Sequence, residues 1–431
     1  MFRFEHLMQH HTASFQRPRY LAPAKDEAQV WVATVKPLPM PDYNMGARLL
    51  PRMSGTGTAT GRADAVLRGT CEALERFCST VFCEEEIVWA SADELGRNAV
   101  DLESFPKCSR NEYNNPKCPL QPPRASDCIR WVRGVSLVTG EIRLLPLRSV
   151  FITRSAVPEE NFLHDISTGC AAHTDYVQAL IAAVLEVVER DALSIAWLQR
   201  LSLPRINTSG DALERSHLGE LIQRSARDIR YHLFDATTDL KIPVVYGLRR
   251  SSVDERLHTL VACAASTDVR RACTKAILEL SSFAVWLRPT RKIPLDLNDF
   301  NRLHHGPAYM AQKSQSDAFQ FLLQSRQCRH IAEISAESPF HEGDSPQTVL
   351  GKLIRTLHEH GHEVFAADLT TREAIRVGIR VVRVVIPSLM PFSWIHRARF
   401  LAHPRLRQAP QNMGYSVNEE ENMNHFPQPF G

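Results

Sequence analysis

The sequence has little net charge and no long hydrophobic run. Its 51 Lys and Arg residues nearly balance 48 Asp and Glu residues, so the formal net charge is only +3. Because the basic residues are also spread along the chain, nothing indicates a nucleic-acid surface. No segment approaches the roughly 20 apolar residues of a membrane helix, and residues 1–20 have no signal-peptide pattern. We therefore expect a cytoplasmic protein that binds neither nucleic acid nor a membrane.

Common cofactor signatures are missing as well. No two of the ten cysteines have the two-residue separation of a zinc knuckle. We therefore interpret the evenly spaced Cys108, Cys118 and Cys128 as free thiols rather than as a metal site. No Gly-Lys-Ser/Thr sequence of a Walker loop occurs, and the chain has no flavin-binding fingerprint. A nucleotide or metal site must therefore be built from other patterns.

The composition, with 44% apolar and 23% charged residues, is typical of a globular protein. Helical and strand-like patterns alternate, which indicates a mixed α/β (α+β) fold with a mixed sheet. The expected helices cover 62–81, 175–199, 268–286 and 346–360. The expected strands cover 30–35, 242–250, 257–266, 363–367 and 379–386, with a hairpin in 129–152 around Gly140.

The chain is expected to divide into three parts. Residues 1–50 form an N-terminal segment, and the main domain covers 51–400. Within that domain, residues 102–128 are dense in Pro, Asn and Ser and indicate a loop insertion. Residues 401–431 form a C-terminal tail that contains proline.

The most informative feature is a motif that occurs twice. Glu-x-x-Glu-Arg appears late in two apolar helices, as Glu72–Arg76 and as Glu186–Arg190. Both copies follow a turn-like stretch of Gly, Ser and Thr, at 54–61 and at 165–169, and they are 114 residues apart. This separation is too long for a solenoid repeat and indicates a duplicated structural unit.

The paired carboxylates of each copy suit a divalent cation. A spacing of three places both glutamates on one helical face. Mg²⁺ prefers such oxygen ligands together with water and phosphate oxygens, and the following arginine suits a phosphate. A single copy is usually a solvated helix face, but here both copies have apolar flanks, where carboxylates without cations would be costly. The expected metal ligands and catalytic residues are Glu72, Glu75, Glu186 and Glu189.

Further residues are candidates for nucleotide contacts. Ser167 and Thr168 precede the second helix, where hydroxyls and backbone N–H groups can hold an anion. Ordinary helix capping is the alternative. The third helix carries Arg271, Lys275 and Glu279 at spacings of four. These three form either a further wall of the site or a simple ladder of side chains on one face.

Together these motifs resemble the YcaO family of cyclodehydratases. The likeness runs from about residue 50 to the end of the chain, and its last five residues are similar to the Pro-x-Pro-x-Pro tail of azoline-forming members. The segments that carry the likeness are the two Glu-x-x-Glu-Arg helices, Ser167–Ala172, Ala272–Glu279, 368–389 and Pro427–Gly431.

The resemblance implies a YcaO-like fold in which duplicated helix-on-sheet units surround a central ATP and Mg²⁺ site, with 51–400 as the catalytic domain. It implies an enzyme that converts Cys, Ser or Thr of a ribosomally made precursor peptide to thiazoline or oxazoline by phosphorylating the backbone amide oxygen. The four glutamates would hold Mg²⁺, and the carboxylate of Gly431 is a candidate general base. The residues expected to bind ATP are Arg76, Ser167, Thr168, Gln178, Arg190, Lys275 and Glu279.

The chain departs from the family pattern at several positions. His173 replaces a glycine, Gln178 replaces an acidic residue, and Thr56 replaces a lysine. In the third helix Ser281-Ser282-Phe283 stands where the family has a glutamine, and Gly431 replaces the last proline. We expect these changes to alter details of the metal site rather than the use of ATP.

The resemblance also implies partners. Because the chain begins without a ThiF-like domain, we expect a discrete subunit that acts with a ThiF-like or C-type protein that binds the leader of the precursor peptide. An FMN-dependent dehydrogenase often accompanies such enzymes, and a homodimer is left open. Two alternatives remain: formation of a thioamide or amidine by the same fold, and a non-catalytic ATP-binding subunit of a peptide-modifying complex.

Overall fold

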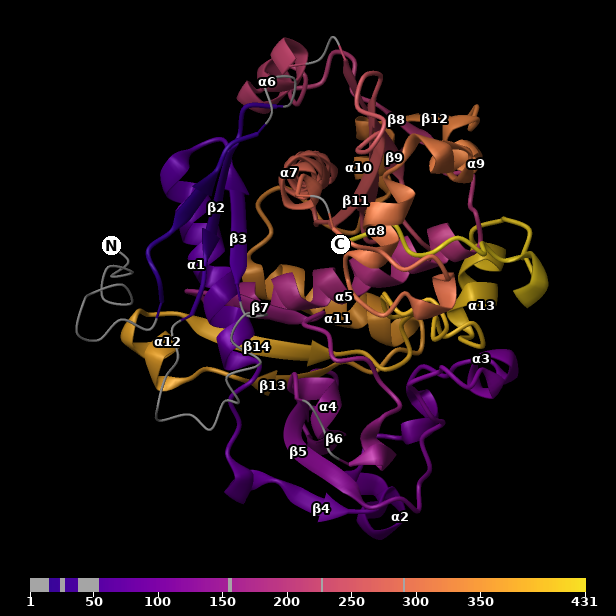
Figure 1. The fold of residues 1–431 in the computed structure, drawn as a ribbon. Coiled ribbons are helices and arrows are strands. Elements are labelled where there is room, and N and C mark those ends of the chain that lie inside the picture. The colour runs from indigo at the N-terminus through magenta and orange to yellow at the C-terminus, as the bar shows by residue number, and fades with distance from the viewer. Residues whose placement is uncertain (1–14, 24–27, 38–53, 154–156, 226–227, 290) are drawn as a thin grey trace.

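The computed structural model describes residues 15–23, 28–37, 54–153, 157–225, 228–289 and 291–431. Much of the expected N-terminal segment therefore lies outside the described residues. The described strands form three sheets (Figure 1). The first is antiparallel and contains, in spatial order, β1 (Arg19–Leu21), β2 (Trp31–Val35) and β3 (Gly55–Ala59).

The other two sheets are larger. The second contains, in spatial order, β11 (Thr259–Ala265), β10 (Val244–Ser251), β9 (Ile229–Asp235), β8 (Arg205–Asn207) and β12 (Cys328–His330). The third contains, in spatial order, β4 (Val88–Ala90), β5 (Ile129–Ser136), β13 (Phe365–Asp368), β14 (Arg380–Val385) and β7 (Cys170–His173), with β6 (Ile142–Pro146) paired to β5. All pairs are antiparallel except β8 with β12.

Three helices carry the predicted site residues: α1 (Arg62–Cys78), α5 (Tyr176–Leu198) and α7 (Val269–Leu287). The remaining α-helices are α2 (Ala92–Leu95), α3 (Arg110–Asn114), α4 (Leu147–Val150), α6 (His217–Ser225), α8 (His305–Met310), α9 (Gln320–Leu323), α10 (Ile331–Glu337), α11 (Pro346–Glu359), α12 (Arg372–Arg376) and α13 (Arg405–Asn412). No helix in the described part of the chain is long and apolar enough to cross a membrane.

The three helices belong to three similar units. Each follows a strand directly, in the order β3–α1, β7–α5 and β11–α7, and packs against that strand. Each also contacts the strand of another unit: α1 contacts β7, α5 contacts β11, and α7 contacts β3. These contacts close a ring of three units around the middle of the molecule (Figure 1). The duplication predicted from the sequence is thus confirmed, and a third unit joins it.

Small residues allow the helices to approach the strands closely. The fourth residue of each helix is alanine, and the eighth is glycine in α1 and alanine in α5 and α7. In the first unit the strand is equally small, because a Cβ on Gly57 would lie 2.0 Å from the Ala65 oxygen. Close contact of backbones therefore fixes the register of each helix against its strand.

The mixed fold and the main helices predicted from the sequence are confirmed, although α1 ends at Cys78 rather than at 81. The prediction of a turn at 54–61 is wrong, because its small residues form β3. The glycines of β3 allow α1 to pack closely against the strand. The turn at 165–169 is confirmed, with Gly169 at φ 85°, but a short strand, β7, lies between it and α5. The hairpin turns near Gly140 as expected.

Helix α5 lies at the centre of the core. Most residues of α5 are buried, and it contacts β14, β11, α11 and α13. The C-terminal part of the chain wraps around its C-terminal end: Asn424 donates its backbone N–H to the Leu198 oxygen, and the Gln199 side chain bonds the backbone of Asn418. The C-terminal tail is thereby tied to the helix that carries the second Glu-x-x-Glu-Arg motif.

Candidate functional site

Glutamates occupy equivalent places on the three central helices. Glu72, Glu186 and Glu279 are each the eleventh residue of their helix. The fourteenth residue is Glu75 in α1 and Glu189 in α5, whereas α7 has Ser282 there. Because the three units are arranged in a ring, these side chains can converge on one site, and the electrostatic interactions among them show that they do.

Each of three glutamates is held by a backbone N–H of a strand or turn. Glu72 Oε2 accepts from the Thr56 N–H on β3 at 2.6 Å. Glu186 Oε2 accepts from the Gly169 N–H at 3.2 Å, in the turn before β7. Glu189 Oε2 accepts from the N–H of Ala265 at 3.0 Å, at the end of β11. The carboxylates are therefore fixed by main chain rather than by flexible side chains.

The five carboxylates on the three helices (Glu72, Glu75, Glu186, Glu189 and Glu279) repel one another. Burial raises the pKa of Glu75 well above its usual value, and the charges of Glu186 and Glu72 raise it further. Burial followed by the charges of Glu189 and Glu72 raises the pKa of Glu279 to about 7. Burial also raises the pKa of Glu186, although Arg190 opposes it. The links run across all three helices, so the glutamates face a common space.

Two arginines, each one turn after a first glutamate, partly offset this charge. Arg76 pairs with Glu72 at 2.5 Å and also donates to the Ser54 oxygen. Arg190 lies 3.5 Å from Glu186 and 3.6 Å from Glu189, which are looser contacts. Its buried Nε has no hydrogen-bond partner among the described residues. A donor in that position is suited to an anion that enters the site.

Sequence reasoning missed a third arginine, Arg383 on β14. Its side chain is buried and donates to the backbone oxygens of Ser149 and Ile166 and to the Cys170 sulfur. Its charge lowers the pKa values of Glu75 and Glu186. The signal in the sequence was an arginine in the middle of an apolar strand, where a charge is costly unless it has partners.

A cavity of about 90 Å³ is lined by two of the arginines that interact with the glutamates. Its lining includes Thr168, Arg190 and Arg383, together with apolar residues from the segment after β14. The structure thus brings two of the predicted nucleotide contacts, Thr168 and Arg190, to one cavity. The Ser167 oxygen instead accepts the Cys170 N–H and closes the turn.

The other predicted contacts lie on the helices themselves. Lys275 donates to the Ala265 oxygen at 3.0 Å, and its charge lowers the pKa of Glu279. Gln178 lies near the start of α5, two turns before Glu186, and its N–H caps onto Asp175. Arg271 is exposed. Lys275 and Glu279 are exposed as well, but the charges of Glu189, Glu72 and Lys275 act on Glu279 and link it to the carboxylate set.

The residues just before the chain end pack into the molecule, whereas Gly431 itself is exposed. Residues 427–430 are buried, and the ring of Phe430 packs edge-on against Tyr246 with centroids 5.1 Å apart. Gly431 lies against Phe283, four residues after Glu279. The C-terminal tail is therefore anchored up to Phe430, and Gly431 lies on the α7 side.

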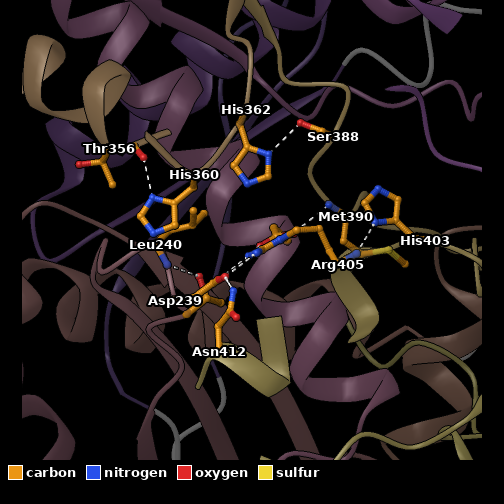
Figure 2. Close-up of polar contacts among 12 residues, drawn as sticks. Asp239, Leu240, Thr356, His360, His362, Ser388, Met390, His403, Arg405 and Asn412 are labelled. Atoms are coloured by element: carbon orange, nitrogen blue, oxygen red, sulfur yellow. Dashed lines mark hydrogen bonds and ion pairs between the residues drawn. The ribbon is translucent and has the colours of Figure 1, made fainter. Parts of the chain in front are cut away.

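A buried ion network fixes α5 immediately after the motif (Figure 2). Asp191 follows Arg190 in the sequence and accepts two hydrogen bonds from the Arg405 guanidinium, at 3.1 and 2.7 Å. The same guanidinium contacts Asp239, which also accepts from Asn412. These bonds join α5, α13 and the β9–β10 connection, so they hold the helix that carries Glu186 and Glu189 in one position.

The residues present fit Mg²⁺ with a nucleotide. Three glutamates with raised pKa values and few nearby cations form a site that a divalent ion would stabilise. No group of three or more His, Cys, Asp or Glu side chains in the described residues is close enough to hold an ion alone. Mg²⁺ takes one or two carboxylates from a protein and completes its shell with water and phosphate oxygens.

Solved structures of similar fold were found by comparison. The first, a heterocyclase in complex with substrate and cofactor, has a TM-score of 0.81 and 20% identity, and covers 99% of this chain and 56% of its own. YcaO from Methanopyrus kandleri, bound with AMPPCP and Mg²⁺, has a TM-score of 0.59 and 19% identity, over 87% of this chain and 86% of its own. The E. coli microcin synthetase McbBCD complex has a TM-score of 0.66 and 13% identity, over 97% of this chain and 99% of its own.

These likenesses establish the fold, and the chain spans only about half the length of the first heterocyclase. A search among curated protein sequences finds no match. A family model described as YcaO cyclodehydratase, ATP- and Mg²⁺-binding, matches residues 56–390 and so contains both Glu-x-x-Glu-Arg helices and the third unit. The match covers well over half of the 431 residues, and the chain therefore belongs to the YcaO cyclodehydratase family.

Proposed function

We propose that this chain catalyses the ATP-dependent cyclodehydration of Cys, Ser or Thr residues in a ribosomally made precursor peptide, forming thiazoline or oxazoline. The observation that carries the proposal is the convergence of five glutamates from three helices, with raised pKa values at Glu75, Glu186 and Glu279. Such a site favours metal-bound phosphates. Its similarity to structures of heterocyclases supports the choice of reaction.

The chemistry explains why ATP is needed. The side-chain sulfur or oxygen of the peptide attacks the preceding carbonyl carbon, and the carbonyl oxygen becomes an alkoxide. This oxygen takes the γ-phosphoryl group of ATP, and ADP leaves. The carbon–oxygen bond then breaks, phosphate departs with the electron pair, and the amide nitrogen loses its proton as the C=N bond forms. An unmodified amide oxygen is a poor leaving group, so phosphorylation supplies the activation.

The protein contributes positioning and charge neutralisation. We assign Mg²⁺ binding to Glu72, Glu75, Glu186 and Glu189; bound Mg²⁺ offsets charge on the phosphates. Arg76 and Arg190 orient these glutamates, and the unpaired Nε of Arg190 is a donor for a phosphate oxygen. The nucleotide contacts assigned beside Arg76 and Arg190 are Ser167, Thr168, Gln178, Lys275 and Glu279.

We assign the C-terminal carboxylate of Gly431 as the general base that removes a proton from the peptide. Two observations support this assignment. The tail is buried up to Phe430, so the exposed terminal residue extends from an anchored neighbour. Gly431 lies against Phe283, which follows Glu279 by one turn of α7. A base must lie within hydrogen-bond reach of the proton it takes, and a fixed tail meets that demand.

The activity requires partners. We propose that the precursor peptide is presented by a ThiF-like or C-type protein that binds its leader, and that an FMN-dependent dehydrogenase can follow; a homodimer is also compatible. The similarity to a microcin synthetase complex with the precursor pro-MccB17 bound supports a peptide substrate and partner proteins. We place the reaction in the cytoplasm and keep 51–400 as the catalytic domain with 401–431 as its tail.

The test uses the full chain with its partner, the precursor peptide, ATP and Mg²⁺, followed by mass spectrometry of the peptide. Cyclodehydration predicts the loss of one water for each ring and one ADP for each water lost. Exchange of oxygen for sulfur in the presence of a sulfide donor would instead indicate thioamide formation. ATP turnover with an unchanged peptide mass would rule out ring formation, and no ATP binding would leave a structural subunit.

A further inference from the structure

Two departures from the family pattern meet in space. The third helix has Phe283 in the segment where the family has a glutamine, and the chain ends in Gly431 where the family has proline. A Cβ built on Gly431 would lie 2.2 Å from Phe283 Cε2 and 2.9 Å from Cζ. Carbon atoms do not pack so closely, so only glycine fits unless the ring or the tail moves. The φ angle of Gly431 is not in the left-handed region, so space is the reason.

Phe283 has little freedom to move away. Its ring stacks on Trp286 with centroids 5.6 Å apart and an interplanar angle of 15°. It also packs against a buried cluster on the far side of α7 that includes Leu260 and Leu280. The Trp286 ring is in turn covered by the guanidinium of Arg291 at 4.5 Å. A shift of Phe283 would therefore disturb a packed aromatic stack.

The tail is equally confined. Phe430 is 2% exposed and is anchored against Tyr246. Two residues earlier, the Gln428 backbone passes so close to α8 that a Cβ on Gly306 would lie 2.2 Å from its oxygen. Any side chain added at position 431 must therefore be accommodated by the terminal residue alone, and the terminal carboxylate would turn away.

The position of this contact is that of a charged group in the other units. Phe283 is the fifteenth residue of α7, where α1 has Arg76 and α5 has Arg190. It follows Glu279 by one helical turn on the same face. In Figure 1 the chain end, marked C, is drawn near α7 and α8. The chain end thus lies beside the place where the third helix lacks a second glutamate.

We propose that Phe283 and Gly431 form a matched pair, in which the Phe283 ring sets the position of the C-terminal carboxylate at the α7 side of the site. Phe283 is then a positioning residue for the chain end, and Gly431 is required by the ring rather than by its own conformation. The inference rests on the proposed function for its catalytic consequence, but the docking of the tail can be measured without any activity.

The first experiment measures hydrogen exchange of the last amides in the full chain. Gly431→Ala should raise the exchange rate of the terminal amides by about tenfold, because the tail no longer docks beside Phe283. The double variant Phe283→Ala/Gly431→Ala removes the clash and should return the rate to within about threefold of the wild type. Together with the single variant Phe283→Ala it completes a double-mutant cycle that measures the coupling. Gly351→Ala, with open space around its site, should change nothing.

The second experiment measures kcat and KM for the wild type, Gly431→Ala, Phe283→Ala and the double variant with partner, peptide, ATP and Mg²⁺. Gly431→Ala should lower kcat about tenfold and leave KM for ATP unchanged, because the nucleotide contacts are intact. The double variant should recover most of the loss. A purely structural role of Phe283 predicts instead that the double variant is worse than either single variant, and a melting curve checks that all four are folded.

Terminal amides as protected in Gly431→Ala as in the wild type would overturn the matched pair, as would a double variant no better than Gly431→Ala. A wild-type chain that forms no azoline would contradict only the proposed function. The exchange experiment would still decide whether the Phe283 side chain holds the tail. A double variant with protected terminal amides but no recovery of kcat would show that the pair exists but that the carboxylate it positions has no part in the reaction. That result would overturn the catalytic consequence of the proposal.

Discussion

Asp191 and Arg405 form a salt bridge of 2.7 Å in which the side chains are 0% and 3% exposed. The pair joins residues more than two hundred positions apart: α5, directly after the second motif, and α13, which leads into the tail. Asp239 and the Met390 N–H satisfy the remaining hydrogen-bonding capacity of the two side chains. One buried guanidinium therefore fixes the carboxylate helix and the C-terminal region relative to each other.

Removing Arg405 should strongly destabilise the fold. Arg405→Met leaves the Asp191 charge buried without a partner and should lower the free energy of unfolding by about 3–5 kcal/mol. Urea unfolding followed by circular dichroism measures this. The matched control is Arg407→Met, whose exposed pair with Glu419 should contribute little to stability because water screens it. Equal losses in both variants would show that the buried network has no special weight.

Neutralising the second motif should abolish ring formation with the fold retained. Glu186→Gln and Glu189→Gln remove negative charge from a site that already repels itself, so neither should lower the melting temperature. Each should lower kcat for azoline formation more than about 100-fold, since transition-state charge is left uncompensated. The control Glu86→Gln alters an exposed glutamate outside the site. Full activity in both site variants would refute the metal assignment.

Stability without Mg²⁺ should fall as pH rises through the range of Glu279. Its pKa is about 7 in the folded chain against an ordinary 4.5, so the folded state holds a proton that the unfolded state has lost. The free energy of unfolding must then decrease between pH 4.5 and 7. Because Glu279 keeps contact with solvent, screening should reduce the effect to about 1–2 kcal/mol.

Glu279→Gln isolates that contribution. Thermal unfolding without metal should show the variant more stable than the wild type at pH 8 and similar to it at pH 5. Saturating Mg²⁺ and ATP should remove the wild type's disadvantage at pH 8, because a cation replaces the lost proton. A pH profile identical in both proteins would contradict the view that Glu279 belongs to the carboxylate set.

The helices and their glutamates could be predicted because each signal is local. A spacing of three places Glu72 and Glu75 on one face whatever the rest of the fold does. By contrast, 54–61 has the composition of a turn. Its glycines form part of β3 because they allow close packing against α1. The tertiary contact overrode the local preference of those residues.

The missing parts of the site depend on long-range register. Arg383 reaches the carboxylates from β14, and Arg405 reaches Asp191 from α13, so neither could be placed without the sheets and the ring of units. The equivalence of Glu279 with Glu72 and Glu186 was equally hidden, because α7 lacks the second glutamate and the arginine that made the duplication visible.

The fate of the amide oxygen tests the proposed reaction most directly. A precursor peptide carrying ¹⁸O in the carbonyl before the reacting Cys or Ser is incubated with the chain, its partner, ATP and Mg²⁺, and the released phosphate is analysed by mass spectrometry. Because the backbone oxygen takes the γ-phosphoryl group, we predict one ¹⁸O in the phosphate for every ring formed. Rings that form while the phosphate stays unlabelled would contradict phosphorylation of the amide oxygen.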